Sequence, residues 1–188
     1  MTTHALSFTP MAVAALLDMP ERQVRKEAEH GILPAVTPPR FDFAALVYLR
    51  VLGMLGLDLG VDGRRHLHRL LAQAAQQDPV PETVEWLPVL TLKVGPVVRE
   101  VSARVEAFEH WTEKLVTSPD ILGGEPVFPS SRLAARHIGA LVEKGETTDA
   151  IRVDYPYLSE EDIHFAHVYS RAYPKLGRPR GRREASAG

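Results

Sequence analysis

The side chains best suited to chemistry in this 188-residue chain are cations that gather in two short segments. Residues 21–30 predict a polar helix, and its outer side carries four side chains that can contact DNA. These are Arg22, Gln23, Arg25 and Lys26. Arginine and glutamine can read base edges in a major groove, and lysine can hold phosphates. Arg40 follows a proline-rich loop, where it could hold a further phosphate and position the protein without reading sequence.

The same helix also fits a simpler interpretation as a solvated surface. Glu21, Glu27 and Glu29 stand among its cations and dilute their charge. Helix faces of mixed charge commonly face water on folded proteins. The residues of this segment leave both interpretations open.

A second group of cations lies in residues 175–188, which hold five basic side chains and one acidic one. Their net charge is +4, while the remaining chain carries −6. The arginines of this tail are Arg178, Arg180, Arg182 and Arg183. An arginine fork matches a carboxylate, so the tail could insert into an acidic site of a partner protein. It also resembles an AT-hook, whose arginines lie in a narrow minor groove, except that Arg183 replaces the final proline. A third interpretation is an inert, solubilising segment.

No set of residues in the chain has the spacing of a catalytic site. His66 and His68 are two apart, so they point apart on a helix. His164 and His167 could share a helix face near Asp162, but a metal site needs at least one further ligand. There is no glycine-rich phosphate loop and no nucleophile elbow. We therefore expect a protein that is not an enzyme and that holds no metal or cofactor.

The composition is that of a folded chain without membrane spans or disulfides. Apolar residues make up 45 % and charged residues 24 %. The absence of cysteine excludes a disulfide scaffold, a thiolate zinc site and cysteine catalysis. No apolar run approaches the roughly 20 residues of a membrane span. The first residues also lack the pattern of a signal peptide, so a cytoplasmic location is expected.

The elements that must position the cations are mostly helices. Hydrophobic spacing and capping residues predict helices over 11–17, 21–30, 41–57, 64–77, 96–110, 133–144, 147–153 and 159–171. The helix over 64–77 is amphipathic, with Arg64, Arg65, His68 and Arg69 expected to point mostly outward. Residues 86–94 alternate like a single strand, and residues 112–129 predict two short strands around a compact loop. These elements divide the whole chain into four segments, which are residues 1–82, a connector over 83–116, residues 117–174 and the tail 175–188.

Residues 7–75 resemble the MerR-type winged helix-turn-helix. The resemblance rests on Phe8, the helix Met11–Leu17, Val24-Arg25, His30-Gly31-Ile32-Leu33 and Arg40-Phe41-Asp42-Phe43. It implies that the helix 21–30 enters a major groove and that Arg40 belongs to the wing. Metal sensors of that family use cysteines, which this chain lacks, so thiol-based metal sensing is excluded.

Residues 117–172 closely resemble the family called "domain of unknown function 433". The motifs are Thr117–Phe128, Ser131-Arg132-Leu133, Arg136-His137-Ile138 and Asp154–Ile163. Ser130 departs from the pattern, because the family has glycine there. We expect Gly123 and Gly124 to serve backbone geometry, and Tyr155 and Tyr157 to pack in the core or between helices.

The two resemblances together imply an antitoxin of a Vap-type toxin–antitoxin pair. Its partner would be a PIN-domain ribonuclease, whose metal-binding carboxylates would be silenced by the arginines of the tail. The protein would also repress its own operon by binding operator DNA as a homodimer. Residues 86–110 would mediate the dimer, because a lone strand needs a partner. The alternatives are a stand-alone transcription regulator that uses its tail on DNA, and an adaptor without a DNA role.

Overall fold

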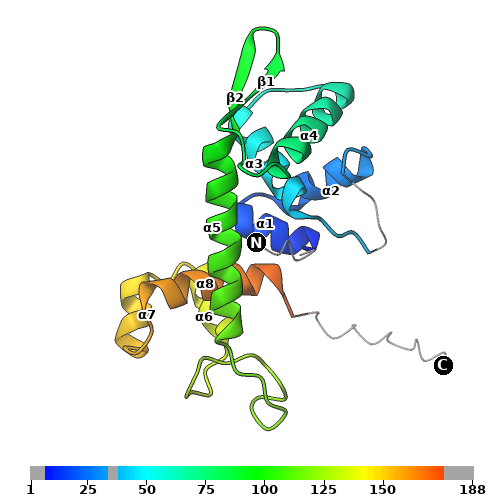
Figure 1. Ribbon diagram of the computed structural model, residues 1–188. Helices are drawn as coiled ribbons and strands as arrows, with labels where there is room; N and C mark the ends of the chain where they lie inside the picture. Colours follow the sequence, from blue (N-terminus) through cyan, green and yellow to red (C-terminus); the bar gives the residue numbers. More distant parts are fainter. Residues whose placement is uncertain (1–6, 34–37, 176–188) are drawn as a thin grey trace, which may run out of the picture.

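The computed structural model describes residues 7–33 and 38–175 of the chain. These residues form eight helices and one two-stranded sheet (Figure 1), so the prediction of a mainly helical fold is confirmed. The elements are α1 (Pro10–Leu17), α2 (Glu21–Glu29), α3 (Phe43–Leu55), α4 (Val61–Ala75), β1 (Thr83–Leu87), β2 (Leu90–Lys93), α5 (Val94–Glu113), α6 (Ala135–Glu143), α7 (Thr148–Asp154) and α8 (Glu160–Ala172). Within the described ranges, no helix is long and apolar enough to cross a membrane.

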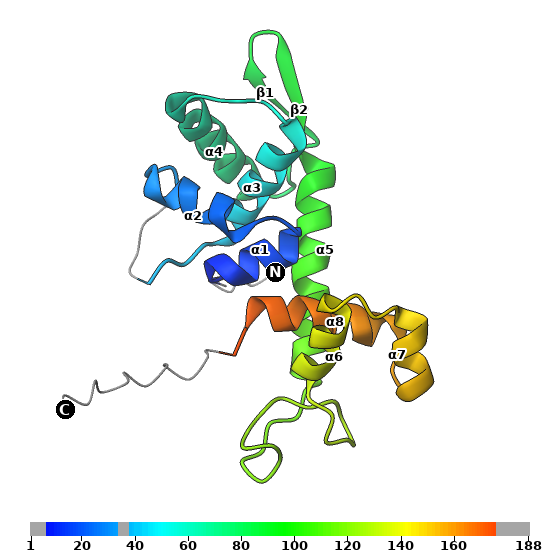
Figure 2. The same cartoon turned by 180° about the vertical axis from the view of Figure 1, so that it is seen from behind.

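The long helix α5 forms the axis of the molecule. Helices α1 to α4 lie along its first half, and α6 to α8 surround its second half (Figures 1 and 2). Val97, Val101, Val105 and Phe108 follow each other at helical spacing and are all buried, as their spacing predicts. Helix α8 crosses α5 and ends beside α1, so the two halves of the chain share one continuous core of buried hydrophobic side chains.

The helix boundaries predicted from capping residues are confirmed at several positions. The side chains of Thr9 and Thr147 accept a hydrogen bond from the first turns of α1 and α7. Ser159 and Asp162 form a reciprocal capping box at the start of α8. Gly31 follows α2 with a φ of +64°, a left-handed conformation that glycine adopts without strain.

The prediction of a single strand over residues 86–94 is wrong. The chain forms a hairpin in which β1 and β2 pair as antiparallel strands, with a turn at Pro88 and Val89. The turn interrupts the alternating pattern, and residues 83–85 extend the first strand. Each strand therefore has its partner within the same chain. Residues 83–93 therefore offer no unpaired strand that would require a second copy of the chain, although the dimer itself stays a prediction.

The predicted strands within residues 112–129 reduce to single bridges. Val127 pairs with Val116 and with Ala134 through isolated bridges. The loop between Val116 and Val127 contains the turns. Gly123 and Gly124 have φ angles of +67° and +87°, which confirms their expected role in backbone geometry. Ser130 has a φ of +56°. The resemblance places glycine at this position, and glycine would adopt that conformation without steric cost.

Candidate nucleic-acid interface

The outer side of α2 is cationic and open to water. Arg22, Gln23, Arg25 and Lys26 are all exposed, while Val24 on the opposite side is completely buried. The side chains of Arg22, Gln23 and Lys26 have no hydrogen-bond or ion-pair partner among the residues that the structure describes. Three of the four groups are therefore available to a ligand without breaking an internal contact.

The fourth group, Arg25, is held by an ion pair on the same helix. Its Nη2 lies 2.6 Å from Oε1 of Glu21, one helical turn earlier, and both side chains are partly open to solvent. Exposed pairs of this spacing contribute about 0.3–0.5 kcal/mol, because water competes for both charges. A phosphate or a base edge can therefore replace Glu21 at little cost.

Glu27 does not dilute the charge of this face, which corrects the sequence interpretation. Its side chain is buried, with a relative exposure of 4 %, on the inner side of α2. It accepts a 2.7 Å hydrogen bond from the Tyr48 hydroxyl of α3 and forms an ion pair with Arg64 of α4. The helical spacing indicates this inward position, because Glu27 lies three residues after the buried Val24 and so shares its side of the helix.

Arg64 belongs to the same buried cluster, so its expected outward orientation is also wrong. Its Nη2 lies 2.9 Å from Nδ1 of His30, at the end of α2. Burial raises the pKa of the Tyr48 phenol, and the adjacent Glu27 carboxylate raises it further. Tyr48 therefore stays a neutral donor at physiological pH. We call these four residues, Glu27, His30, Tyr48 and Arg64, the α2 anchor, because they fix α2 to α3 and α4.

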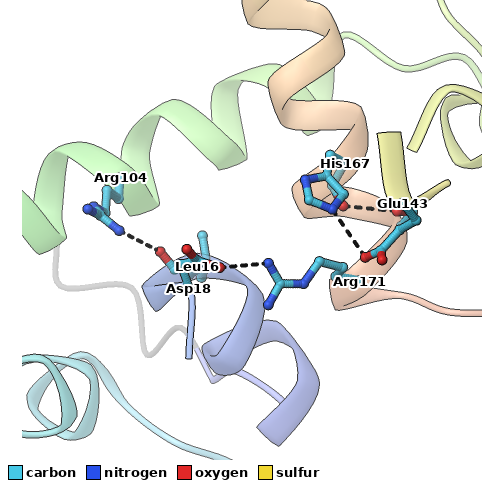
Figure 3. A network of polar contacts seen from close by, with 7 residues as sticks. Leu16, Asp18, Arg104, Glu143, His167 and Arg171 are labelled. Carbon is cyan, nitrogen blue, oxygen red and sulfur yellow. Dashed lines mark hydrogen bonds and ion pairs between the residues drawn. The ribbon is translucent and has the colours of Figure 1, made fainter. Parts of the chain in front are cut away.

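The turn between α1 and α2 is held from the second half of the chain. Arg104 of α5 donates a 3.1 Å hydrogen bond to the carbonyl oxygen of Leu16 (Figure 3). Arg171 of α8 forms an ion pair with Asp18, in which Nη1 lies 2.9 Å from Oδ1. The hydrogen bond from Arg171 is the main reason that the pKa of Asp18 lies below its ordinary value. Helix α8 therefore contributes directly to the position of the α1–α2 pair.

A cationic hollow of about 360 Å³ lies on α4, next to the end of α2. Its lining residues are Ile32, Arg65, His68, Arg69, Ala72, Gln73 and Gln76. Arg65 reaches the carbonyl oxygen of His30 at 3.4 Å, so the hollow adjoins the α2 anchor. His68 is half-buried against the Tyr48 ring, contrary to its expected outward orientation, and burial lowers its pKa. The lining contains two arginines, of which Arg65 pairs with Asp62 just outside the hollow (Nη1 to Oδ1, 3.3 Å), so the positive charge open to an anion comes mainly from Arg69.

Arg40, the fifth residue predicted to contact DNA, lies just before α3. Arg40 is exposed, and its positive charge acts on the phenol of Tyr173, just beyond α8. Arg178, Arg180, Arg182 and Arg183 lie outside the described residues.

The histidines of α8 have local partners. His164 packs edge-on against Phe165, and Nε2 of His167 lies 3.1 Å from Glu143 of α6. Among the residues described, no group of three histidine, aspartate or glutamate side chains gathers where it could hold a metal ion.

Comparison with known proteins identifies one part of this helical protein. Residues 115–170 match the family described as "Protein of unknown function (DUF433)", which confirms the predicted DUF433 domain. The chain is also similar to "Uncharacterized protein y4eO" of Sinorhizobium fredii, with 34 % identity over 91 residues. The match covers 48 % of this chain and 41 % of that relative, so less than half of the relative's length is spanned. No solved structure matches the chain.

Proposed function

We propose that this protein binds DNA through the outer side of α2. The observation that carries the proposal is the exposed cationic face of Arg22, Gln23, Arg25 and Lys26 on a helix whose other side is firmly anchored. A recognition helix needs both properties, because base contacts require donors that are free and a backbone that does not shift. The cationic hollow on α4 adds positive charge beside the same helix.

The finer proposal is a MerR-like winged helix-turn-helix. Two short helices meet at a tight turn whose Asp18 has a left-handed φ of +49°. A bridge between Phe8 and Phe41 brings the residues before α1 to those before α3. This closure supports an arrangement in which Arg40, just before α3, belongs to the wing.

For the DUF433 domain we propose the role of an antitoxin module. This proposal rests on the sequence resemblance to antitoxins of Vap-type pairs, whose partner is a PIN-domain ribonuclease. The arginines of the tail would bind the carboxylates of that enzyme. The protein would act in the cytoplasm as a homodimer that binds operator DNA and represses its own operon, because paired half-sites require paired recognition helices.

Substituting Arg25 tests the DNA-binding proposal. If Arg25 contacts a base edge, Arg25→Ala weakens binding to a DNA fragment from upstream of the gene by about 1–3 kcal/mol, which is about 5- to 150-fold. Fluorescence anisotropy of the labelled fragment at fixed salt measures the change. Arg132→Ala is the matched control, because Arg132 is an exposed arginine of the DUF433 domain. Equal affinities of the two variants would remove Arg25 from the reading surface.

Deleting residues 176–188 tests the role of the tail. The deletion keeps the ion pair between Lys175 and Glu125, in which Nζ lies 2.9 Å from Oε2. The antitoxin proposal predicts that the truncated protein binds the upstream DNA normally but no longer inhibits a ribonuclease encoded beside it. The two measurements are gel retardation and cleavage of a fluorescent RNA. Unchanged inhibition together with weakened retardation would instead assign the tail to DNA and favour the stand-alone regulator. If the intact protein retards no upstream DNA, the adaptor interpretation is favoured.

A further inference from the structure

Glu21 of α2 holds the guanidinium of Arg25 in one orientation. Its Oε1 accepts a 2.7 Å hydrogen bond from Nε of Arg25 and lies 2.6 Å from Nη2. We propose that Glu21 is a positioning residue, which fixes Arg25 so that the free end of the guanidinium reads guanine in the major groove. The proposal rests on the DNA-binding function proposed for the outer side of α2. It adds the base that is read and the residue that makes the reading selective.

The ion pair leaves free the part of Arg25 that a guanine needs. A guanidinium has five N–H groups in a rigid plane. Glu21 occupies only the edge formed by Nε and Nη2, and no residue in the described part of the chain contacts Nη1. The two parallel N–H groups at the Nη1–Nη2 end match O6 and N7 of guanine. A base can therefore bind Arg25 while Glu21 stays in place, even though the pair could be opened at little cost.

The pair also places the guanidinium at the end of α2 that a recognition helix presents to bases. Glu21 is the first residue of α2, so the head group of Arg25 lies over the first turn of the helix. Helix-turn-helix proteins contact base edges with the N-terminal residues of the recognition helix. The side chains of Glu21 and Arg25 are 31 % and 49 % exposed, so a ligand can reach them. The donors of Arg25 are therefore preformed where base contacts are expected, which reduces the entropy lost on binding.

The negative charge of Glu21 makes Arg25 better suited to bases than to phosphates. A phosphate attracts any cation, because that interaction does not depend on sequence. In the pair, the carboxylate offsets the charge of the guanidinium, so the attraction to phosphates falls while the hydrogen-bond geometry toward a base is kept. Arg22 and Lys26 have no such partner within the described ranges, so their charge is available to phosphates. The α2 cations therefore divide between phosphate contacts and base reading.

The test compares how each variant distinguishes one base pair. Methylation of guanine N7 in a DNA fragment from upstream of the gene locates the guanines that the protein contacts, and Arg25→Ala identifies the one that depends on Arg25. That G·C pair is then replaced by A·T, and fluorescence anisotropy gives the ratio of the two dissociation constants. We expect the unchanged protein to favour G·C about 5- to 150-fold, the range of a good bidentate contact. Glu21→Ala should reduce this ratio at least fivefold, whereas Glu21→Gln, whose amide oxygen can still accept, should retain most of it.

Glu29 provides the matched control for the charge of Glu21. It is an exposed carboxylate on the same helix and has no partner among the described residues. Glu29→Ala removes the same charge, so it should tighten binding to both fragments equally and leave their ratio unchanged. Circular dichroism confirms that all variants are folded.

Three results would overturn the proposal. The first is a ratio that Glu21→Ala leaves unchanged, and the second is the lack of any guanine contact that depends on Arg25. The third is equally weakened binding of Glu21→Ala to both fragments, because that would show a purely structural role in α2. In each case the unchanged protein still retards DNA, so the DNA-binding proposal stands. If the unchanged protein retards no upstream DNA, the DNA-binding proposal itself fails, and this role of Glu21 fails with it.

Discussion

Replacing Glu27 by alanine is expected to lower the free energy of unfolding by about 3–5 kcal/mol, because it removes one partner of a buried ion pair. Arg64 would keep its charge in a site where its side chain is 12 % exposed and its Nε already lacks a partner. The Tyr48 hydroxyl would lose its acceptor as well. Urea denaturation followed by circular dichroism measures the change.

A double variant separates this explanation from a general loss of packing. Replacing the pair by apolar residues, with Glu27→Leu and Arg64→Met together, should recover most of the lost stability, because no buried charge remains. Glu82→Gln is the control, since it alters an ion pair with Arg99 that lies on the surface, and its unfolding midpoint should not change. A Glu27→Ala variant as stable as this control would show that the α2 anchor does not support the fold.

The anchor also predicts a loss of DNA binding without a lost DNA contact. Glu27 faces the interior, so it cannot touch a ligand on the outer side of α2. Its removal should nevertheless weaken binding in folded variants, because the recognition helix loses its fixed orientation. The double variant provides the comparison, since it restores packing under α2 and leaves the outer cations unchanged.

Replacing Gly139 by alanine is expected to destabilise the contact between α6 and α8 by about 1–3 kcal/mol or more, since it overpacks a filled interface. A β-carbon at Gly139 would lie 2.6 Å from the carbonyl oxygen of Ala166 and would collide with the side chain of Ser170. The clash with backbone cannot be relieved by a rotamer change, so the two helices would have to separate. Thermal unfolding measures the effect.

Gly53 provides the matched control for this substitution. It also lies in a helix, α3, but a β-carbon there would meet no atom within 4 Å. Gly53→Ala should therefore stabilise the protein by about 0.5–1 kcal/mol, because alanine has less backbone freedom to lose than glycine. If both substitutions raised the unfolding temperature, the close approach of α6 and α8 would be contradicted.

Local features of this protein were predictable from the sequence. Thr9, Thr147 and Ser159 begin helices because their hydroxyls accept hydrogen bonds from nearby amides, an interaction within three residues of the chain. The resemblance to DUF433 likewise rests on motifs of neighbouring residues, and residues 115–170 match that family. The alternating run over 86–94 does not predict the hairpin, because it contains only the end of β1 and all of β2, with Pro88 and Val89 forming the turn between them.

The sequence by itself determined the helices, their caps and the cationic outer side of α2, because each depends on periodicity or on neighbours within one turn. Only the tertiary structure decided which charges are available at the candidate site. It buried Glu27 against Tyr48 and Arg64, which lie 21 and 37 residues further along the chain. The negative charge of Glu27 therefore does not offset the positive charges on the outer side of α2. The tertiary structure also left Tyr157 exposed, contrary to the expectation that it packs, and brought the rings of Trp111 and Phe128 together. Such pairings depend on how whole helices pack, which no local spacing specifies.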